Sequence, residues 1–347
     1  MSKVTLKELA KVLNMSVSTV SKALNDSHEI SDATKEIVKK FAKERNYQPN
    51  PLAKYLKLGR SNSIGVILPS IGNPFHGQVI ESLHNYASLH NFNLIIMQSK
   101  DSEEIETKAI QTLLNQGIDG IIISPAHETS NIELLKKIHE STCPVIIFDR
   151  INYDLNTYKI GVNNFQSGLD ATAELIKIGR RKIVILCGKN IGVTKQRLAG
   201  YEVALKRNGI EVNQDYIVYC NYNNSFEEFD HDLKEKIAAL MEDPSTAPDA
   251  IFGTTDTLTT RVLGILADLE IQVPSELAVI GFANTEIANS LNPALSTIRQ
   301  PTAEIAALSV EMLIKLITTK KNRSQIDFQE FKLDSSIQLR KSTDIDS

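Results

Sequence analysis

Apolar and polar positions alternate with the period of an α-helix through the first 46 residues. Leucine and alanine at spacings of three and four predict a short helix over residues 6–13, with Thr5 as N-cap and Glu8 completing a capping box. Ser16 is the expected N-cap of a second helix that ends near residue 24, and Ser31 is the expected N-cap of a third. The residues of the third helix that are expected to point inward are Ile37, Val38, Phe41 and Ala42.

The pattern changes at residue 63, where short β-branched runs begin to alternate with helical segments. A first series reads SIGVILP, FNLIIMQ, DGIIISP and PVIIFDR, and a second reads KIVILCG, IVYCN, DAIFGTT and LAVIGF. These runs are apolar on both faces, as the strands of a parallel sheet are when helices cover both sides. We therefore expect an α/β protein in which a small all-α head precedes two doubly wound α/β lobes.

The formal net charge of −4 conceals an uneven distribution along the chain. The first 60 residues hold 12 Lys and Arg against 6 Asp and Glu, whereas the rest holds 26 basic against 36 acidic residues. A basic head on an acidic body is typical of a protein that binds a polyanion such as nucleic acid, although lysine-rich surface helices produce the same pattern.

Several classes of protein are disfavoured by what the sequence lacks. No apolar run approaches the roughly 20 residues that span a bilayer, and the lysine-bearing N-terminus does not read as a signal peptide. The three cysteines form no C-x-x-C pair and the seven histidines are dispersed, so we expect neither a disulfide framework nor a metal site. Dinucleotide, P-loop, serine-hydrolase and zinc-protease motifs are missing, so we expect no cofactor and no enzyme. A reducing cytoplasm fits these observations.

The stretch MSVSTVSKALN, residues 15–25, places small polar side chains on the expected second helix. Two short helices joined by a tight turn form a helix-turn-helix, whose second helix enters the major groove of DNA. Small side chains on that helix let its backbone approach the duplex closely. For these eleven residues taken alone, a plain surface helix with capping serines is the alternative.

The wider sequence resembles the LacI/GalR family of bacterial transcriptional regulators. The resemblance is carried by VTLKELAKVLNMSVSTVSKALN, ISDATKEIVKKFAKERNYQPNPLAKYLKLGRS and IGVILPSIGNPF, and it extends over essentially the whole chain. It implies a ligand-responsive regulator, in most cases a repressor, which binds a pseudo-palindromic operator as a homodimer at the nucleoid in the cytoplasm. By this resemblance the base-reading residues are Val17, Ser18 and Lys22. The residues near phosphate are Leu6, Thr19, Ser21, Asn25, Ser31 and Thr34. Apart from the resemblance, the hydroxyls of Ser16 and Thr19 can donate to phosphates at the start of the second helix.

Lys22 stands where the family usually has arginine. Arginine binds guanine through two parallel hydrogen bonds, whereas lysine acts as a point charge, so we expect guanine recognition here to be looser or different.

The segment PLAKYLKLGR, residues 51–60, has a helical pattern only about two turns long, which is too short to be stable alone in water. In the family this segment is the hinge helix, which pairs across the dimer in the minor groove. The resemblance implies that Leu56 wedges into the central base step, that Ala53 allows close approach and that Lys57 neutralises phosphate. A flexible linker between domains is the alternative.

Polar and aromatic side chains follow several of the expected strands, where ligands bind in open α/β sheets. A ring that stacks on a sugar or base, beside charged groups that form paired hydrogen bonds, suits a polar small molecule. The family's effector positions fall on the same residues: Phe75, His76, Asp149, Arg150, Arg197, Asp256 and Asn284. For each of them a loop-capping or ion-pairing role is the alternative. Many members of the family have an aspartate where this chain has Ala283, so a carboxylate acceptor is missing and the ligand of sugar-binding relatives does not carry over directly. A sugar or sugar derivative is favoured, while a sugar acid, sugar phosphate or nucleobase stays open.

The sequence predicts a helix-turn-helix domain at 1–49 and a hinge helix with linker at 50–61. The first lobe is expected at 62–161 and 291–323, and the second at 162–290 and 324–347. Together the lobes would form a periplasmic-binding-protein-like body, in which an effector in the cleft favours one lobe arrangement and so changes DNA affinity by allostery. A two-lobed sugar-binding protein without a transcriptional role would have the same body, but the basic head favours the regulator.

Overall fold

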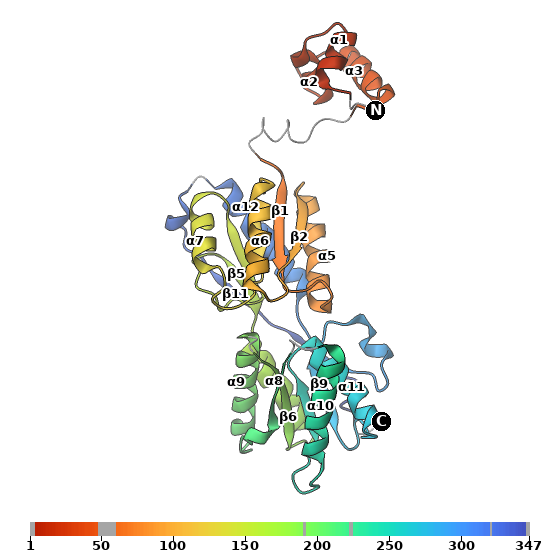
Figure 1. The fold of residues 1–347 in the computed structure, drawn as a ribbon, viewed down its shortest axis with the longest axis vertical. Helices are drawn as coiled ribbons and strands as arrows, with labels where there is room; N and C mark the ends of the chain where they lie inside the picture. The colour runs from red at the N-terminus through yellow and green to blue at the C-terminus, as the bar shows by residue number, and fades with distance from the viewer. Residues whose placement is uncertain (1–3, 48–59, 190–191, 222–224, 320, 345–347) are drawn as a thin grey trace. The chain divides into compact units, whose positions relative to one another are not determined.

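The computed structural model describes residues 4–47, 60–189, 192–221, 225–319 and 321–344 (Figure 1). The chain divides into two compact units, a head (residues 1–61) and a body (residues 62–347). The head holds one small cluster of buried side chains, and the body holds two six-stranded sheets. Each unit therefore has an apolar core of its own.

The head is helical, and each of its helices begins at the N-cap that the sequence predicts. Thr5 and Glu8 form the reciprocal capping box, and the hydroxyls of Ser16 and Ser31 each accept a hydrogen bond from the backbone amide three residues later. The helices are α1 (Leu6–Val12), α2 (Val17–Leu24) and α3 (Asp32–Glu44). Their buried core consists of Leu9, Ala10, Val20, Ala23, Val38 and Ala42.

The prediction that Ile37 points inward is wrong, because its side chain is 53% exposed. Val38 and Ala42, which are one turn apart on α3, take the core positions, and Phe41 is half-buried against them. Successive helix residues are rotated by about 100°, so Ile37 falls outside the narrow face that a small three-helix core can cover.

The first lobe is built on a sheet with strand order β11-β5-β4-β3-β1-β2, in which all pairings are parallel. Helices α5 and α12 cover one face and α6 and α7 cover the other. The strands are β1 (Ser63–Leu68), β2 (Asn93–Gln98), β3 (Gly120–Ile123), β4 (Val145–Phe148), β5 (Lys159–Val162) and β11 (Glu330–Leu333). The helices are α5 (Pro74–Leu89), α6 (Glu103–Asn115), α7 (Ile132–Ser141), α12 (Thr302–Thr318) and the short η3 (Arg323–Gln325).

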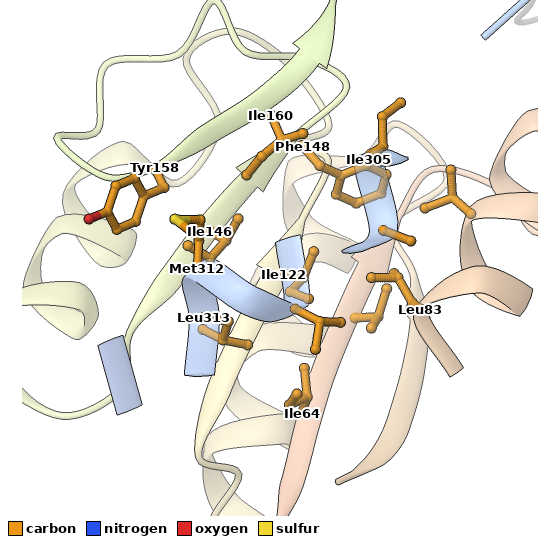
Figure 2. Packing of buried hydrophobic residues seen from close by; sticks show 14 of the residues in the cluster. Ile64, Leu83, Ile122, Ile146, Phe148, Tyr158, Ile160, Ile305, Met312 and Leu313 are labelled. Atoms are coloured by element: carbon orange, nitrogen blue, oxygen red, sulfur yellow. The ribbon is translucent and has the colours of Figure 1, made fainter. Parts of the chain in front are cut away.

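Successive residues of the central strands enter opposite layers of this lobe. On β3, Ile122 packs in the cluster with α5 and α12, whereas its neighbours Ile121 and Ile123 pack with α6 and α7. Figure 2 shows the first of these layers, where Phe148 of β4 lies among side chains that include Leu83 of α5 and those of α12. Both faces of the central strands β1, β3 and β4 are thus buried, which is why these strands are almost wholly apolar.

The second lobe repeats this design with strand order β12-β10-β9-β8-β6-β7, in which only β12 runs antiparallel to its neighbour. Helices α8 and α9 cover one face and α10 and α11 the other, so the prediction of two doubly wound lobes is confirmed. The strands are β6 (Ile183–Gly188), β7 (Ile217–Cys220), β8 (Ala250–Gly253), β9 (Ala278–Phe282), β10 (Ser296–Arg299) and β12 (Ser336–Gln338). The helices are α8 (Asn164–Lys177), α9 (Gly192–Arg207), α10 (Phe226–Met241), α11 (Asp256–Asp268) and the short η1 (Gln214–Tyr216) and η2 (Glu286–Ser290).

The chain passes between the lobes after β5, after β10 and after β11, which corrects the predicted division. Residues 291–323 were expected in the first lobe, but β10 pairs with β9 in the second sheet. Residues 324–347 were expected in the second lobe, but β11 pairs with β5 in the first sheet. The first crossing follows residue 162, where β5 ends, instead of residue 161. Four-residue strands carry no local signal of which distant strand they will join.

Candidate functional site

The start of α2 exposes a short run of small side chains. Ser16, Val17 and Ser18 are exposed, whereas Val20 and Ala23 on the same helix are fully buried. The buried pair fixes the rotation of α2 about its axis and thereby turns the first three residues outward. Backbone amides at a helix start, together with exposed hydroxyls, suit a phosphate group, and the narrow side chains leave room for a base edge.

The hydroxyls predicted near phosphate already cap helices. Ser16 Oγ lies 2.8 Å from Thr19 Oγ1 at the start of α2, and Ser31 Oγ lies 2.9 Å from Thr34 Oγ1 at the start of α3. Leu6 is half-buried against the core of the head. These residues therefore hold the two helix starts in place.

The longer polar side chains of α2 have partners within the head. The Lys22 ammonium pairs with the carboxylate of Glu29, and the Asn25 side-chain amide donates to the Ser21 carbonyl at 2.8 Å. Both groups are therefore engaged within the head in this structure. The hinge residues Ala53, Leu56 and Lys57 lie outside the described residues.

A small pocket lined by both polar and apolar residues lies in the body, between the two lobes. The loops after β3 and β4 form its first-lobe wall, and the starts of α8 and α9 form its second-lobe wall. Of the seven predicted effector residues, Asp149 and Arg150 line it. The full lining is Ala126, His127, Glu128, Asp149, Arg150, Ile151, Asn152, Asn164, Gly192, Val193 and Gln196.

Asp149 follows β4 directly and has a φ of 62°, a left-handed conformation that residues other than glycine rarely adopt. Its Oδ2 accepts a hydrogen bond from Ser124 Oγ at 3.1 Å and lies 3.6 Å from His76 Nε2. Burial opposes ionisation of this carboxyl group, but His76, Arg150 and Arg197 outweigh it and hold the pKa of Asp149 below its usual value. Asp149 is therefore an anionic acceptor in the pocket.

His76 and Phe75 lie behind Asp149. His76 Nδ1 is 3.1 Å from the Ser70 carbonyl oxygen, and its buried Nε2 has no hydrogen-bond partner among the described residues. Phe75 is buried in the core of the first lobe, with its ring centroid 5.3 Å from that of His76. Phe75 therefore supports His76 in this structure and does not line the pocket.

Arg150 lines the pocket and is bonded to the loop after β3, which forms part of the pocket wall. Its Nη1 donates to Asp101 Oδ1 at 2.7 Å, to the Pro125 carbonyl at 3.1 Å and to the Ala126 carbonyl. This guanidinium therefore has a carboxylate partner of its own and holds the loop after β3.

Arg197 is buried, and its guanidinium joins several elements. Nε donates to Asn164 Oδ1 at 2.8 Å, Nη2 to Gln300 Oε1 at 3.1 Å and Nη1 to the Thr254 carbonyl. The group also lies over the ring of Phe282, 3.4 Å from the centroid. Arg197 thus orients Asn164, which lines the pocket, and is not itself in the lining.

Asp256 and Asn284 form a second buried pair outside the pocket lining. Asp256 Oδ1 accepts a hydrogen bond from the backbone amide of Asn284 at 2.7 Å. Burial raises the pKa of Asp256, although this hydrogen bond and Arg197 oppose the change. The Asn284 side chain exchanges two hydrogen bonds with the backbone of Gln300, each 3.0 Å long. The structure therefore brings all seven predicted residues to one region but leaves five of them behind the wall of the pocket.

Five polar residues of the pocket were not predicted from the sequence: His127, Glu128, Asn152, Asn164 and Gln196. The first four follow β3, β4 or β5, so the rule that selected Asp149 applied to them as well. Gln196 lies within α9, where no such signal exists.

A buried carboxyl group holds the loop that carries Glu128. Glu106 of α6 accepts hydrogen bonds from the Ala126 amide at 2.6 Å, from Ser130 Oγ at 2.9 Å and from Asn131 Nδ2 at 2.9 Å. Burial raises the pKa of Glu106 even though these three donors lower it. The pocket wall after β3 is therefore anchored from behind.

Within the described ranges, no three His, Cys, Asp or Glu side chains are grouped so as to hold a metal ion. Nor is any helix in those ranges both long and apolar enough to cross a bilayer.

Two family models match the chain. Residues 5–50 match the model described as "Bacterial regulatory proteins, lacI family", and residues 172–343 match "Periplasmic binding protein-like domain". The first match covers the helices of the head. The second covers most of the second lobe, together with α12 and β11 of the first lobe. The match of the head favours the regulator over a sugar-binding protein without a transcriptional role.

Curated relatives align over nearly the full length of the chain. The ribose operon repressor of Haemophilus influenzae is 30% identical over 341 residues, which cover 97% of this chain and 98% of the relative. The catabolite control protein A of Priestia megaterium is 28% identical over 344 residues, which cover 98% and 99%.

Solved structures share the fold at lower sequence identity. The Lac repressor dimer bound to operator and the anti-inducer ONPF has a TM-score of 0.83 at 22% identity, with 99% of each chain covered. The transcriptional regulator CelR in complex with cellobiose has a TM-score of 0.71 at 22% identity, with 98% of this chain and 100% of that chain covered. With 30% identity to a repressor over nearly its whole length and a matching DNA-binding head, the chain belongs to the lacI family of bacterial regulatory proteins.

Proposed function

We propose that the protein represses transcription by binding a pseudo-palindromic operator as a homodimer, under the control of a sugar or related polar small molecule in the interlobe pocket. The observation that carries this proposal is the start of α2, where buried Val20 and Ala23 turn Ser16, Val17 and Ser18 outward. Because a two-fold symmetric protein presents two such helices, its operator has matching half-sites.

The roles of single residues on DNA are part of the proposal. Val17, Ser18 and Lys22 read base edges, and the capping hydroxyls, with Leu6, Ser21 and Asn25, lie near phosphate. In the hinge, Leu56 wedges between base pairs, Ala53 permits close approach and Lys57 neutralises phosphate.

The pocket suits a neutral hydroxylated ligand better than an anion. Asp149 is ionised and accepts hydrogen bonds, whereas Arg150 already pairs with Asp101. Two relatives carry sugar names, a ribose operon repressor and a regulator solved with cellobiose. Because walls from both lobes would contact the ligand, it would favour one lobe arrangement over others. The protein would act by this linkage in the cytoplasm, without catalysis.

Selection from random-sequence duplexes tests the DNA-binding part. We expect a pseudo-palindromic motif, and Lys22→Ala should relax the preference at one position of each half-site by about 1–3 kcal/mol. Lys40→Ala, on the exposed side of α3, should leave that preference unchanged. Leu56→Ala should reduce both affinity and DNA bending. Recovery of no common motif would refute the operator proposal.

A thermal-shift screen with sugars, sugar acids, sugar phosphates and nucleobases tests the effector part. A ligand present at 100 times its dissociation constant adds about 2.7 kcal/mol of stability, which gives a readily measured shift. We expect a neutral sugar to give the largest shift and Asp149→Asn to abolish it. A larger shift with a sugar phosphate, or one that survives Asp149→Asn, would contradict the proposed effector class.

A further inference from the structure

We propose that Gln78, Asn284 and Glu286 form a latch between the two lobes, and that this latch sets how tightly the pocket binds its effector. The proposal rests on the proposed function for its effector, but the latch itself can be tested without one. Gln78 lies on α5 of the first lobe, whereas Asn284 follows β9 and Glu286 begins η2 in the second lobe.

A single side-chain amide makes all the contacts of the latch from the first lobe. Gln78 Nε2 donates to the Asn284 carbonyl oxygen at 2.6 Å and to Glu286 Oε1 at 2.8 Å. Gln78 Oε1 accepts from Asn284 Nδ2 at 3.1 Å. Both donors and the acceptor are thus used, so neither a carboxylate nor an apolar side chain could replace this amide without loss.

The second-lobe half of the latch is held rigidly. The Asn284 side chain is buried and bonded to the backbone of Gln300 in both directions, which leaves its amide in one orientation. Arg299 Nη2 donates to Glu286 Oε1 at 2.7 Å. Its hydrogen bond and charge hold the pKa of Glu286 below the usual value, so this carboxylate is ionised at neutral pH.

The latch is connected to the pocket by consecutive hydrogen bonds. Asn284 is bonded to the Gln300 backbone, the Gln300 side chain accepts from Arg197 at 3.1 Å, and Arg197 donates to Asn164 at 2.8 Å. Asn164 lines the pocket. We therefore expect a change in the position of Gln78 relative to Asn284 to shift Asn164, which lines the pocket.

The pocket has walls from both lobes, so it is complete only while the lobes keep this arrangement. A closed latch assembles the pocket before the effector arrives, and the effector then spends no binding free energy on bringing the lobes together. Opening the latch should therefore weaken effector binding although Gln78 is not part of the pocket lining.

Moving the carboxylate from one side of the latch to the other tests whether these hydrogen bonds control effector binding. Gln78→Glu removes both donors and places a second carboxylate against Glu286, with little change in size. Adding Glu286→Gln restores a donor that faces the new carboxylate. The matched control is Gln111→Glu, the same substitution at an exposed position of α6 in the same lobe.

Hydrogen exchange followed by mass spectrometry on the ligand-free, full-length protein gives the first readout. In Gln78→Glu we expect exchange in the segment 283–290 to accelerate about tenfold, since two hydrogen bonds are lost. The double variant should return to within about threefold of the wild type, and Gln111→Glu should match the wild type. Unchanged exchange in Gln78→Glu, or no recovery in the double variant, would overturn the latch.

Calorimetric titration with D-ribose and with cellobiose gives the second readout. We expect the dissociation constant of the sugar that binds to rise about tenfold in Gln78→Glu and to recover in the double variant. An unchanged constant in Gln78→Glu would overturn control of the pocket by the latch. If the wild-type protein binds neither sugar, the proposed sugar class fails, and hydrogen exchange still decides whether the latch exists.

Discussion

The charged side chains around the pocket already have polar or charged neighbours within the protein. Asp149 lies beside His76, Arg150 pairs with Asp101, and Arg197 is bonded to Asn164. A ligand would gain affinity by contacting Asp149 and Asn164, which line the pocket, without breaking the pairs behind them. Such preformed contacts lower the conformational cost of binding.

His139 illustrates how burial at a single residue changes the response to pH. It is buried on α7, and its Nδ1 accepts a hydrogen bond from the Val145 amide at 3.0 Å. Burial, with the nearby charge of Arg323, lowers the pKa of His139 from 6.5 to about 4. Below pH 6.5 the unfolded chain binds a proton that the folded protein does not, so the free energy of unfolding falls between about pH 6.5 and 4.

We therefore expect roughly 2–4 kcal/mol of stability to be lost through His139 over that interval. His139→Asn, which keeps an acceptor for Val145, should reduce the slope of stability against pH in urea unfolding experiments. His84→Gln, at an exposed position of α5, should leave the slope unchanged. Equal slopes in His139→Asn and the wild type would contradict the assignment.

Among the helices, the close packing of α8 against α9 is what brings Asn164 and Arg197 together. A Cβ added at Gly168 would lie 2.2 Å from the Arg197 carbonyl oxygen, and one added at Gly200 would lie 2.2 Å from the Phe165 carbonyl oxygen. Glycine is therefore required at both positions because backbone, not a movable side chain, occupies the space. The hydrogen bond from Arg197 to Asn164 depends on this approach.

Gly200→Ala should force α8 and α9 apart and lower the free energy of unfolding by at least about 2 kcal/mol. The matched control is Gly264→Ala on α11, where an added Cβ meets nothing within 4 Å. That change should be neutral or stabilise the protein by up to about 1 kcal/mol, because alanine is the better helix former. Urea unfolding checks both values, and similar effects at the two positions would show that the packing of α8 on α9 tolerates a methyl group.

For the whole molecule, regulation requires that effector binding to the body and operator binding to the head be thermodynamically linked. The body has an arrangement of lobes in which the pocket is complete, and the chain passes between these lobes after β5, β10 and β11. A ligand that favours one arrangement can change operator affinity only by its difference in affinity between arrangements.

We therefore expect reciprocity between effector and operator. If the effector changes the operator dissociation constant by a factor of roughly 5 to 150, the operator must change the effector dissociation constant by the same factor. Fluorescence anisotropy with labelled operator, and calorimetry with and without operator, measure the two factors. An effector that binds in the pocket and leaves operator affinity unchanged would separate sensing from DNA binding in this protein.

Local features of the structure were determined by the sequence alone. The capping residues Thr5, Ser16 and Ser31, the helical periods of the head and the alternation of strands with helices in the body all follow from neighbours a few residues apart. Such patterns are readable because capping and amphipathic periodicity act over one or two turns. The two-lobed architecture could be predicted on this basis, whereas the family was predicted from the resemblance of the motifs in residues 4–25, 30–61 and 64–75.

Only the tertiary structure decided which distant segments meet. It placed β10 and β11 in the sheets opposite to those predicted, and it put Asp149 in the pocket while Phe75 went into the core. It also joined Gln78 to Asn284 across 206 residues. Nothing local in the sequence encodes these contacts, because they depend on how whole elements pack and on which buried polar groups then find partners.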